Sequence, residues 1–211
     1  MKIKPFTFNA FQVKTYLLYD DTKEGVVIDA GMNSSEENSI FDTFVEKNGL
    51  VLKHHLLTHA HIDHVLGSAH IRDRYGLLPE MHKDGLLFLQ TMEHFIDLYG
   101  LNPVETVYPS QYLTEKDTIP FGDTVLEILY TPGHAAGSLC YLNKPDKVIF
   151  TGDVLFKESI GRTDLPTGDF DLLMKSIKEK IFTLPGDFKV YPGHGEPTTI
   201  AYEMAHNPFI M

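Results

Sequence analysis

The strongest constraint on this chain is a run of four metal-ligating side chains within six residues: His59, His61, Asp63 and His64. The run follows a strand-like apolar segment and precedes a helix-like apolar pattern. If residues 59–63 are extended, side chains alternate, and His59, His61 and Asp63 point to one side. His64 breaks the alternation and approaches the same point from the start of the helix. This geometry suits two adjacent metals better than one.

The apolar pattern switches repeatedly between strand and helix periods. We expect strands at residues 3–8, 13–19, 25–29, 51–57, 77–81, 117–121, 124–130, 138–142, 147–151 and 188–191. We expect helices from a serine cap at 34 or 35 to 48, at 64–75, at 169–182, and from about 197 to a point before 208. Residues 83–112 are expected to contain one or two further helices and an irregular loop.

The order of these elements predicts the architecture. Two strand-rich halves flanked by helices indicate an α/β fold, specifically a four-layer αββα sandwich. No linker divides the chain, so we expect residues 1–211 to form one domain. Pro79 favours an edge position for its strand, because proline cannot donate a hydrogen bond to a neighbouring strand.

Composition limits the classes of partner that the chain can bind. The formal net charge of −11 disfavours binding to a nucleic-acid backbone, which usually needs a basic surface. No stretch approaches the roughly 18 apolar residues of a membrane span, so no membrane partner is expected. The first residues lack the apolar core of a signal peptide, and the single cysteine, Cys140, lies in an apolar strand. We expect a cytoplasmic protein with a buried thiol, and the oligomeric state stays open.

Three further turns place a ligand-type side chain directly after a strand. Pro132-Gly133-His134 and Pro192-Gly193-His194 share one design, and Gly152-Asp153 ends a third strand. Proline fixes φ, and glycine permits a positive φ or a close backbone approach, so such turns aim the side chain that follows. Loops at strand ends on a rigid scaffold are a favoured place for active sites.

The candidate ligands are then five histidines and two aspartates. Imidazole nitrogen and carboxylate oxygen suit zinc, with iron and manganese as competitors. A carboxylate at Asp153 can bridge two metals about 3.5 to 4 Å apart. Water bound to zinc has a pKa of about 7, so hydroxide would be available at neutral pH. The remaining histidines lack such spacing, and we expect ordinary core or surface roles for His54, His55, His70, His82, His94 and His206.

This ordered pattern resembles the metallo-β-lactamase superfamily, and within it the hydroxyacylglutathione hydrolase (glyoxalase II) group. The similarity is greatest to short bacterial members that lack an additional C-terminal helical domain. The matching positions are His59, His61, Asp63, His64, His134, Asp153 and His194. The resemblance implies that His59, His61 and His134 hold one metal. It also implies that Asp63, His64 and His194 hold a second metal, with Asp153 as the bridge.

The resemblance also implies roles for two residues outside the ligand set. Asp29, at a strand end, is similar to a residue that orients a metal ligand. The segment Gly161-Arg162-Thr163-Asp164 resembles a loop whose arginine lies near glutathione, so Arg162 can pair with a substrate carboxylate. A structural ion pair of Arg162 with Asp164 or Asp169 is the competing interpretation.

The activity implied by the resemblance is metal-dependent hydrolysis of thioesters at a binuclear centre. The expected substrate is S-lactoylglutathione or another S-acylated small thiol, and Asp63 and Asp153 are the expected catalytic carboxylates. β-Lactam hydrolysis is not expected, because true β-lactamases are not expected to have the bridging aspartate. Three alternatives stay open: a mononuclear iron persulfide dioxygenase that uses His59, His134 and Asp153, a lactonase or other ester hydrolase, and a metal-binding module without catalysis.

Overall fold

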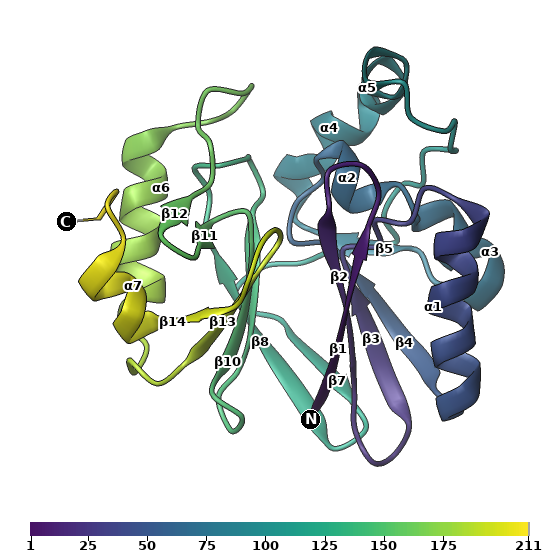
Figure 1. Ribbon diagram of the computed structural model, residues 1–211, viewed down its shortest axis with the longest axis horizontal. Coiled ribbons are helices and arrows are strands. Elements are labelled where there is room, and N and C mark those ends of the chain that lie inside the picture. The colour runs from purple at the N-terminus through teal and green to yellow at the C-terminus, as the bar shows by residue number, and fades with distance from the viewer. Residues whose placement is uncertain (211) are drawn as a thin grey trace.

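Two six-stranded sheets face each other in the computed structural model, which describes residues 1–210 (Figure 1). The first sheet follows chain order: β1 (Lys2–Phe8), β2 (Val13–Tyr19), β3 (Glu24–Ile28), β4 (Val51–Leu56), β5 (Pro79–Met81) and β6 (Gln111–Tyr112). The second has the order β14-β13-β10-β9-β8-β7 and contains β7 (Thr118–Phe121), β8 (Thr124–Tyr130), β9 (Leu139–Asn143), β10 (Val148–Gly152), β13 (Lys189–Pro192) and β14 (Thr198–Thr199). A separate hairpin joins β11 (Leu155–Phe156) and β12 (Ser159–Ile160).

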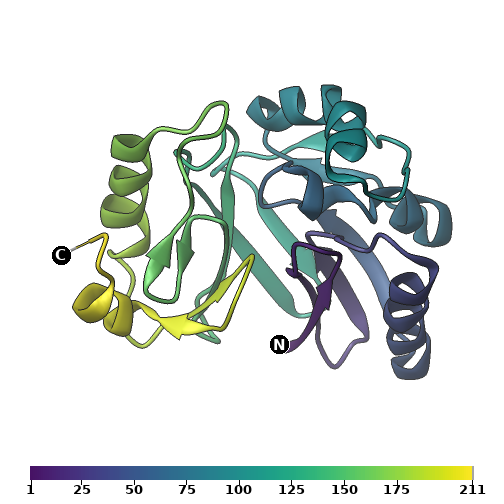
Figure 2. The ribbon, with the colours of Figure 1, turned by 45° about the horizontal axis from the view of Figure 1, so that its top comes forward.

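Helices cover the outer faces of both sheets (Figure 1). The first sheet is flanked by α1 (Ser35–Asn48) and α3 (Ser68–Tyr75). The second is flanked by α6 (Phe170–Ser176), a π-helical turn (Ile177–Ile181) and α7 (Ile200–His206). Figure 2 shows α4 (Leu86–Gln90) and α5 (Met92–Tyr99) in teal at one end of the sandwich, after the short helix α2 (Ile62–Val65) and the 3-10 turn Lys83–Gly85. This arrangement confirms the predicted αββα sandwich.

Alternation along the strands separates the apolar residues into layers. Leu18 of β2 and Val26 of β3 lie in the cluster between the two sheets, whereas the neighbouring Leu17 and Val27 pack with residues of α1. On the second sheet, Tyr141 faces the first sheet, and Cys140 and Leu142 pack with α6 and the π-helical turn. Cys140 is fully buried, as predicted.

The expected edge position of Pro79 is wrong. β5 lies between β4 and β6 and pairs in parallel with both of them. Pro79 is the first residue of this three-residue strand. A proline is tolerated at the first residue of a strand, where its missing N–H removes little from the ladder.

The predicted helix at 64–75 is divided into α2 and α3, and α2 begins at Ile62. The expected extended conformation of residues 59–63 is therefore wrong at its last two positions, and Asp63 is helical. Gly67 separates the two helices because it packs against the loop after β3. Its N–H donates to the Ala30 carbonyl at 2.7 Å, and a Cβ at Gly67 would lie 2.9 Å from that oxygen.

Candidate metal centre

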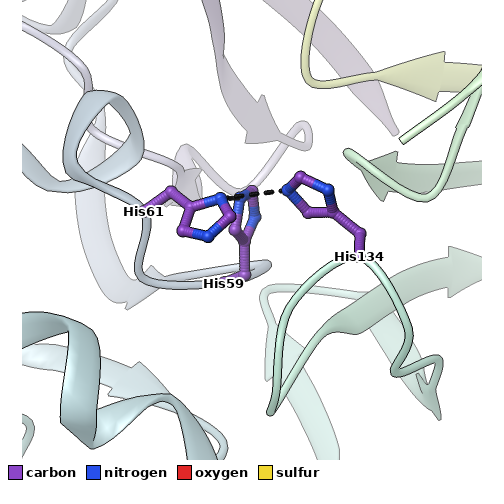
Figure 3. A group of neighbouring side chains, drawn as sticks. All are labelled: His59, His61 and His134. Carbon is purple, nitrogen blue, oxygen red and sulfur yellow. Dashed lines mark hydrogen bonds between the residues drawn. The ribbon is translucent and has the colours of Figure 1, made fainter. Parts of the chain in front are cut away.

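Three histidines form the first candidate ligand group (Figure 3). His59 and His61 follow β4 of the first sheet, and His134 follows β8 of the second. His61 Nδ1 lies 3.1 Å from His59 Nε2 and 3.0 Å from His134 Nε2. A tetrahedral zinc ion with Zn–N distances of about 2.0–2.1 Å separates its ligand nitrogens by roughly 3.3 Å. The spacing of the three nitrogens is therefore close to that of a metal site.

The second candidate group consists of Asp63, His64 and His194. Asp63 Oδ2 lies 3.1 Å from His194 Nε2 and 3.4 Å from His64 Nε2. Asp153 lies between the groups: its Oδ1 is 3.4 Å from His64 Nε2, and its Oδ2 is 3.6 Å from His194 Nε2 and 3.7 Å from His134 Nε2. The structure brings all seven predicted ligand residues together and places Asp153 where it can bridge two metals.

Hydrogen bonds from the outer ring nitrogens hold four of the five imidazoles in place. His134 Nδ1 donates to the Arg162 carbonyl at 2.7 Å, and His194 Nδ1 donates to the Phe11 carbonyl at 3.1 Å. His64 Nδ1 lies 2.9 Å from Asp29 Oδ2. These bonds keep the Nδ1 protons directed outward, so each neutral ring presents its Nε2 lone pair to the centre.

Asp29 also orients His59, through Thr58. The Thr58 hydroxyl donates to Asp29 Oδ2 at 2.7 Å, so its oxygen accepts from His59 Nδ1, which lies 3.1 Å away. The Thr58 N–H donates to Asp29 Oδ1, also at 2.7 Å. Asp29 therefore contacts Thr58, which supports His59 of the first group, and His64 of the second group; its role in orienting metal ligands stays a prediction. Thr58 is a participant that the sequence interpretation missed, although it directly precedes the motif.

The inward-facing atoms have more lone pairs than the protein itself can satisfy. His59 and His134 both direct lone pairs at His61 Nδ1, which can donate one proton at most. His64 Nε2 and Asp153 Oδ1 are buried without a hydrogen-bond partner. Such orphaned atoms are costly unless another group satisfies them. The donor set and its unmet lone pairs fit two divalent cations.

The charge states of the two groups differ. In the first, burial and then neighbouring imidazoles lower the pKa of His59 well below its ordinary value and that of His61 to about 3. In the second, burial opposes protonation of His64, but nearby carboxylates, Asp63 foremost, raise its pKa. The pKa of Asp153 is lowered because His64 and other imidazoles outweigh burial. Neighbouring imidazoles therefore disfavour positive charge in the first group, whereas the carboxylates around the second group favour it.

Glycines in the strand-end turns let the ligands approach one another, as predicted. Gly152, which precedes Asp153, has a φ of +50°. A Cβ at Gly193 would collide with Asp153 Oδ1, so His194 reaches the centre only because the residue before it is glycine. The Tyr16 hydroxyl donates to the Pro192 carbonyl at 2.7 Å and ties this last turn to β2.

The hairpin tip between β1 and β2, residues 9–12, supports the second group, and the sequence interpretation missed this role. Asn9 Nδ2 donates to the Asp63 carbonyl at 2.9 Å and to the Gly31 carbonyl at 2.8 Å. Phe11 provides the carbonyl that accepts from His194. Asn9 has a φ of +52°, which asparagine tolerates better than most residues. The preference of asparagine for turns is the only sequence signal for this support.

A pocket of about 370 Å³ adjoins the ligand groups. One side is made by ligand residues: His61, Asp63, His134, Asp153 and His194. The other sides come from the hairpin tip, from α4 and α5, and from the loop 161–167. Parts of the segments 83–112 and 161–167 therefore lie where a substrate would meet the candidate ligands.

Arg162 lines this pocket, but its guanidinium is already paired. Its Nε and Nη2 each donate to one carboxylate oxygen of Asp164 at 2.7 Å. The competing interpretation, an ion pair with Asp164, is thus present, whereas Asp169 instead accepts from Leu172 N at the start of α6. Contact of Arg162 with a substrate carboxylate stays a prediction.

A family profile described as the Metallo-beta-lactamase superfamily matches residues 8–194. This chain belongs to the metallo-β-lactamase superfamily. Its relatives in the superfamily include hydroxyacylglutathione hydrolase GloC of Haemophilus influenzae, which is 35% identical over 100% of this chain and 98% of GloC. The probable metallo-hydrolase YqgX of Bacillus subtilis is 34% identical over 100% of this chain and 95% of its own.

Solved structures of the superfamily resemble the whole chain. BLEG-1, described as a B3 metallo-beta-lactamase, has a TM-score of 0.89 at 36% identity and covers 99% of both chains. TTHA1623 in a di-iron-bound form has a TM-score of 0.87 at 31% identity, over 98% of this chain and 99% of its own. ETHE1 from Myxococcus xanthus has a TM-score of 0.79 at 29% identity, over 99% of this chain and 84% of its own. These superfamily members confirm the fold, while their descriptions differ in metal and activity.

Two histidines of β4 lie outside the ligand groups, as expected. His54 Nδ1 is 2.7 Å from Glu80 Oε1. His55 is fully buried, neither of its ring nitrogens has a partner, and burial lowers its pKa to about 3. Within residues 1–210, no helix is long and apolar enough to cross a membrane.

Proposed function

We propose that this protein is a binuclear metal-dependent hydrolase of thioesters, acting on S-lactoylglutathione or a similar S-acylated small thiol. The observation that carries the proposal is the pair of three-residue ligand groups that share Asp153 beside a pocket. The full-length similarity to GloC of Haemophilus influenzae supports a thioester as the substrate. We further propose a small-molecule substrate in the cytoplasm rather than a nucleic acid, since the net charge is −11.

We propose two divalent cations as cofactors, zinc foremost, with iron or manganese as competitors. His59, His61 and His134 would hold one cation, Asp63, His64 and His194 the other, and Asp153 both. Such cations, when bound, polarise a carbonyl and lower the pKa of water toward neutrality. The di-iron form of TTHA1623 supports iron as a serious competitor.

Within this proposal, the carboxylates handle the proton. Burial raises the pKa of Asp63, but His64 and His194 together lower it below its ordinary value, so Asp63 is ionised at neutral pH and can accept a proton from the attacking water. Asp63 Oδ2 faces His64 and His194, so we assign the proton transfer to Oδ1. Asp153 is ionised for the same reason and would hold the two ligand groups at a fixed separation.

The direct test is turnover of S-lactoylglutathione by protein loaded separately with zinc, iron and manganese. Elemental analysis of each preparation should find two metal ions per chain. The His59→Ala variant is the control, because it removes a nitrogen of the first group without changing the pocket wall. Turnover no greater than that of His59→Ala would rule out this substrate.

An iron-dependent alternative is a persulfide dioxygenase that uses His59, His134 and Asp153. The similarity to ETHE1 and to di-iron TTHA1623 keeps this candidate open. One iron per chain together with oxygen uptake on a glutathione persulfide would select it. The same panel should contain a lactone and the β-lactam nitrocefin, because BLEG-1 is described as a B3 metallo-beta-lactamase. The expectation that Asp153 excludes β-lactam hydrolysis therefore stays a prediction.

A further inference from the structure

The pocket wall opposite the ligand residues is apolar. α4 and α5 contribute Leu87, Phe88, Met92 and Phe95, and the loop 161–167 contributes Leu165. The centroids of the Phe88 and His61 rings lie 4.7 Å apart, in an edge-to-face arrangement. The apolar wall therefore begins directly beside the first ligand group, so a substituent on the hydrolysed carbonyl or on its sulfur would contact it.

Of the polar side chains of this wall, Thr91 and Arg162 are already engaged, whereas the Tyr99 hydroxyl has no hydrogen-bond partner within residues 1–210. The Thr91 hydroxyl can donate to the Leu87 and Phe88 carbonyls, 3.3 and 3.2 Å away in its own helix. Arg162 is the one arginine or lysine among the described residues that line this pocket, and both carboxylate oxygens of Asp164 bind it. The wall thus offers hydrophobic contact and little hydrogen bonding to an incoming ligand.

A glutathionyl group would fit this wall poorly, because it carries two carboxylates, an ammonium group and two amides. Each of these groups loses hydration when it is buried and regains it only through matching partners. The wall provides one cation, already neutralised, for two carboxylates. An alkyl or aryl group has no such cost and gains from contact with Leu87, Phe88, Met92 and Phe95.

We infer that this pocket binds an uncharged apolar arm, alkyl or aryl, attached to the thioester that is hydrolysed. The inference rests on the proposed function and narrows its substrate class. The arm belongs either to the acyl group or to the thiol, and a charged remainder such as glutathione stays in solvent. In the reaction, the oxygen of water bonds to the acyl carbon and the carbon–sulfur bond breaks. The products are a carboxylate and a thiol, with one proton released to solvent.

The first experiment compares thioesters on the metal-loaded protein. The first substrate series keeps glutathione as the thiol and varies the acyl group through lactoyl, acetyl, butyryl, hexanoyl and phenylacetyl. The second series keeps acetyl and varies the thiol through glutathione, N-acetylcysteamine and benzyl mercaptan. We expect kcat/KM to rise about fourfold for each methylene that enters the pocket, in whichever series varies the apolar group that the pocket binds. The inference would be overturned by two results together: a higher kcat/KM for the lactoyl thioester than for the hexanoyl and phenylacetyl thioesters, and no higher kcat/KM for the benzyl thioester than for the other acetyl thioesters.

The second experiment uses a matched pair of variants on α5. Phe95 lines the pocket, whereas Leu98 is 61% exposed and is not among the lining residues. Phe95→Asn should lower kcat/KM about tenfold for the preferred apolar thioester and by a smaller factor for S-acetylglutathione, whose methyl group contacts less of the wall. Leu98→Asn likewise replaces an apolar side chain of α5 with asparagine and should leave kcat/KM for both substrates unchanged. Equal losses on the apolar and acetyl substrates would show that Phe95 supports only the fold.

A binding measurement separates failure of this inference from failure of the proposed function. Benzyl mercaptan binding, followed by calorimetry on the metal-loaded protein, needs no turnover. If no thioester is hydrolysed, the proposed function fails. The pocket assignment then holds only if Phe95→Asn weakens this binding about tenfold relative to Leu98→Asn. Equal binding by the two variants would overturn it.

Discussion

The two ligand groups differ in what holds them in place. His59 and His134 are each 2% exposed, and their outer nitrogens contact groups in the interior and in the loop 161–167. The His194 side chain is 28% exposed, and its outer nitrogen contacts the Phe11 carbonyl in the hairpin tip. The first group is built into the core, whereas the second depends partly on a surface turn. The two metal sites should therefore differ in robustness.

The largest effect is expected where the two groups share a support. Asp29→Asn should lower metal affinity at both groups by up to about 100-fold, because the amide cannot accept from Thr58 and His64 as the carboxylate does. Asparagine tolerates the φ of +55° at this position, so the backbone should not change. Competition with a chelator measures the affinities. Asp42→Asn, which alters a carboxylate bonded to His70 and Tyr75 on the helical side, is the control. Loss at only one group would contradict the shared role of Asp29.

The next effect is a loss of folding stability in acid that comes from His55, which lies in β4 outside the ligand groups. His55 has a pKa of about 3 when folded and 6.5 as its ordinary value, so below pH 6.5 the unfolded chain binds the additional proton. Stability is therefore lost as the pH falls from 6.5 toward 3. The His55→Met variant should not show this loss. Its free energy of unfolding minus that of the parent protein should therefore increase by about 2 kcal/mol as the pH falls from 7.5 to 5.

Denaturant titrations at the two pH values measure this difference, with exposed His94→Met as the control. A constant difference between the His55→Met variant and the parent across this range would mean that His55 is not held neutral by burial.

A smaller and selective effect is expected at the hairpin tip. Asn9→Gly should lower metal affinity of the second group about tenfold and leave the first group unchanged, since Asn9 contacts the Asp63 carbonyl. Gln12→Gly makes a comparable change at a position of the same tip with a φ of +59°. After mild chelation, the Asn9→Gly protein should keep one metal per chain where Gln12→Gly keeps two. Equal loss from both groups would remove the distinction between them.

The smallest effect concerns the loop that supports His134. Asp164→Asn frees Arg162, whose exposed pair with Asp164 contributes little to stability. The freed guanidinium should lower KM for glutathione thioesters about threefold relative to the matching N-acetylcysteamine thioesters. Steady-state kinetics on the two substrates measure the ratio. An unchanged ratio would argue that Arg162 does not meet a substrate carboxylate.

Most of the helices and strands could be predicted from the sequence because helix caps, turn residues and apolar periodicity mark their ends and faces. The Ser34 hydroxyl accepts from Glu37 N and Gly49 has a φ of +61°, so both ends of α1 follow from the sequence. The seven ligand residues were also recognisable, since strand-end turns with proline and glycine repeat around them. Their division into two groups with Asp153 as the bridge follows from the resemblance to the superfamily rather than from the turns, and metal binding there stays a prediction.

The remaining features depend on contacts between distant segments. Gly67 divides α2 from α3 only because Ala30 approaches it, and that approach is not encoded within residues 62–75. Pro79 is not in an edge strand because β6, at residues 111–112, pairs beyond β5 and is a two-residue strand with no pattern of its own. The support from Asn9 to Asp63 spans 54 residues, and a turn preference alone does not predict its partner. Periodicity describes which face a residue occupies, not which segment meets it.

The late position of His194 in the order of the candidate ligands has a consequence for biosynthesis. At about 5–20 residues per second, roughly 7 to 27 s pass between synthesis of the first motif histidine and that of His194. Within that interval the turns that carry His134 and Asp153 are made, and the turn that carries His194 comes last. A nascent chain therefore presents a cluster of histidines with open coordination positions to whichever cation is most available. The second group is therefore complete only when β13 pairs with β10 and brings His194 to the centre.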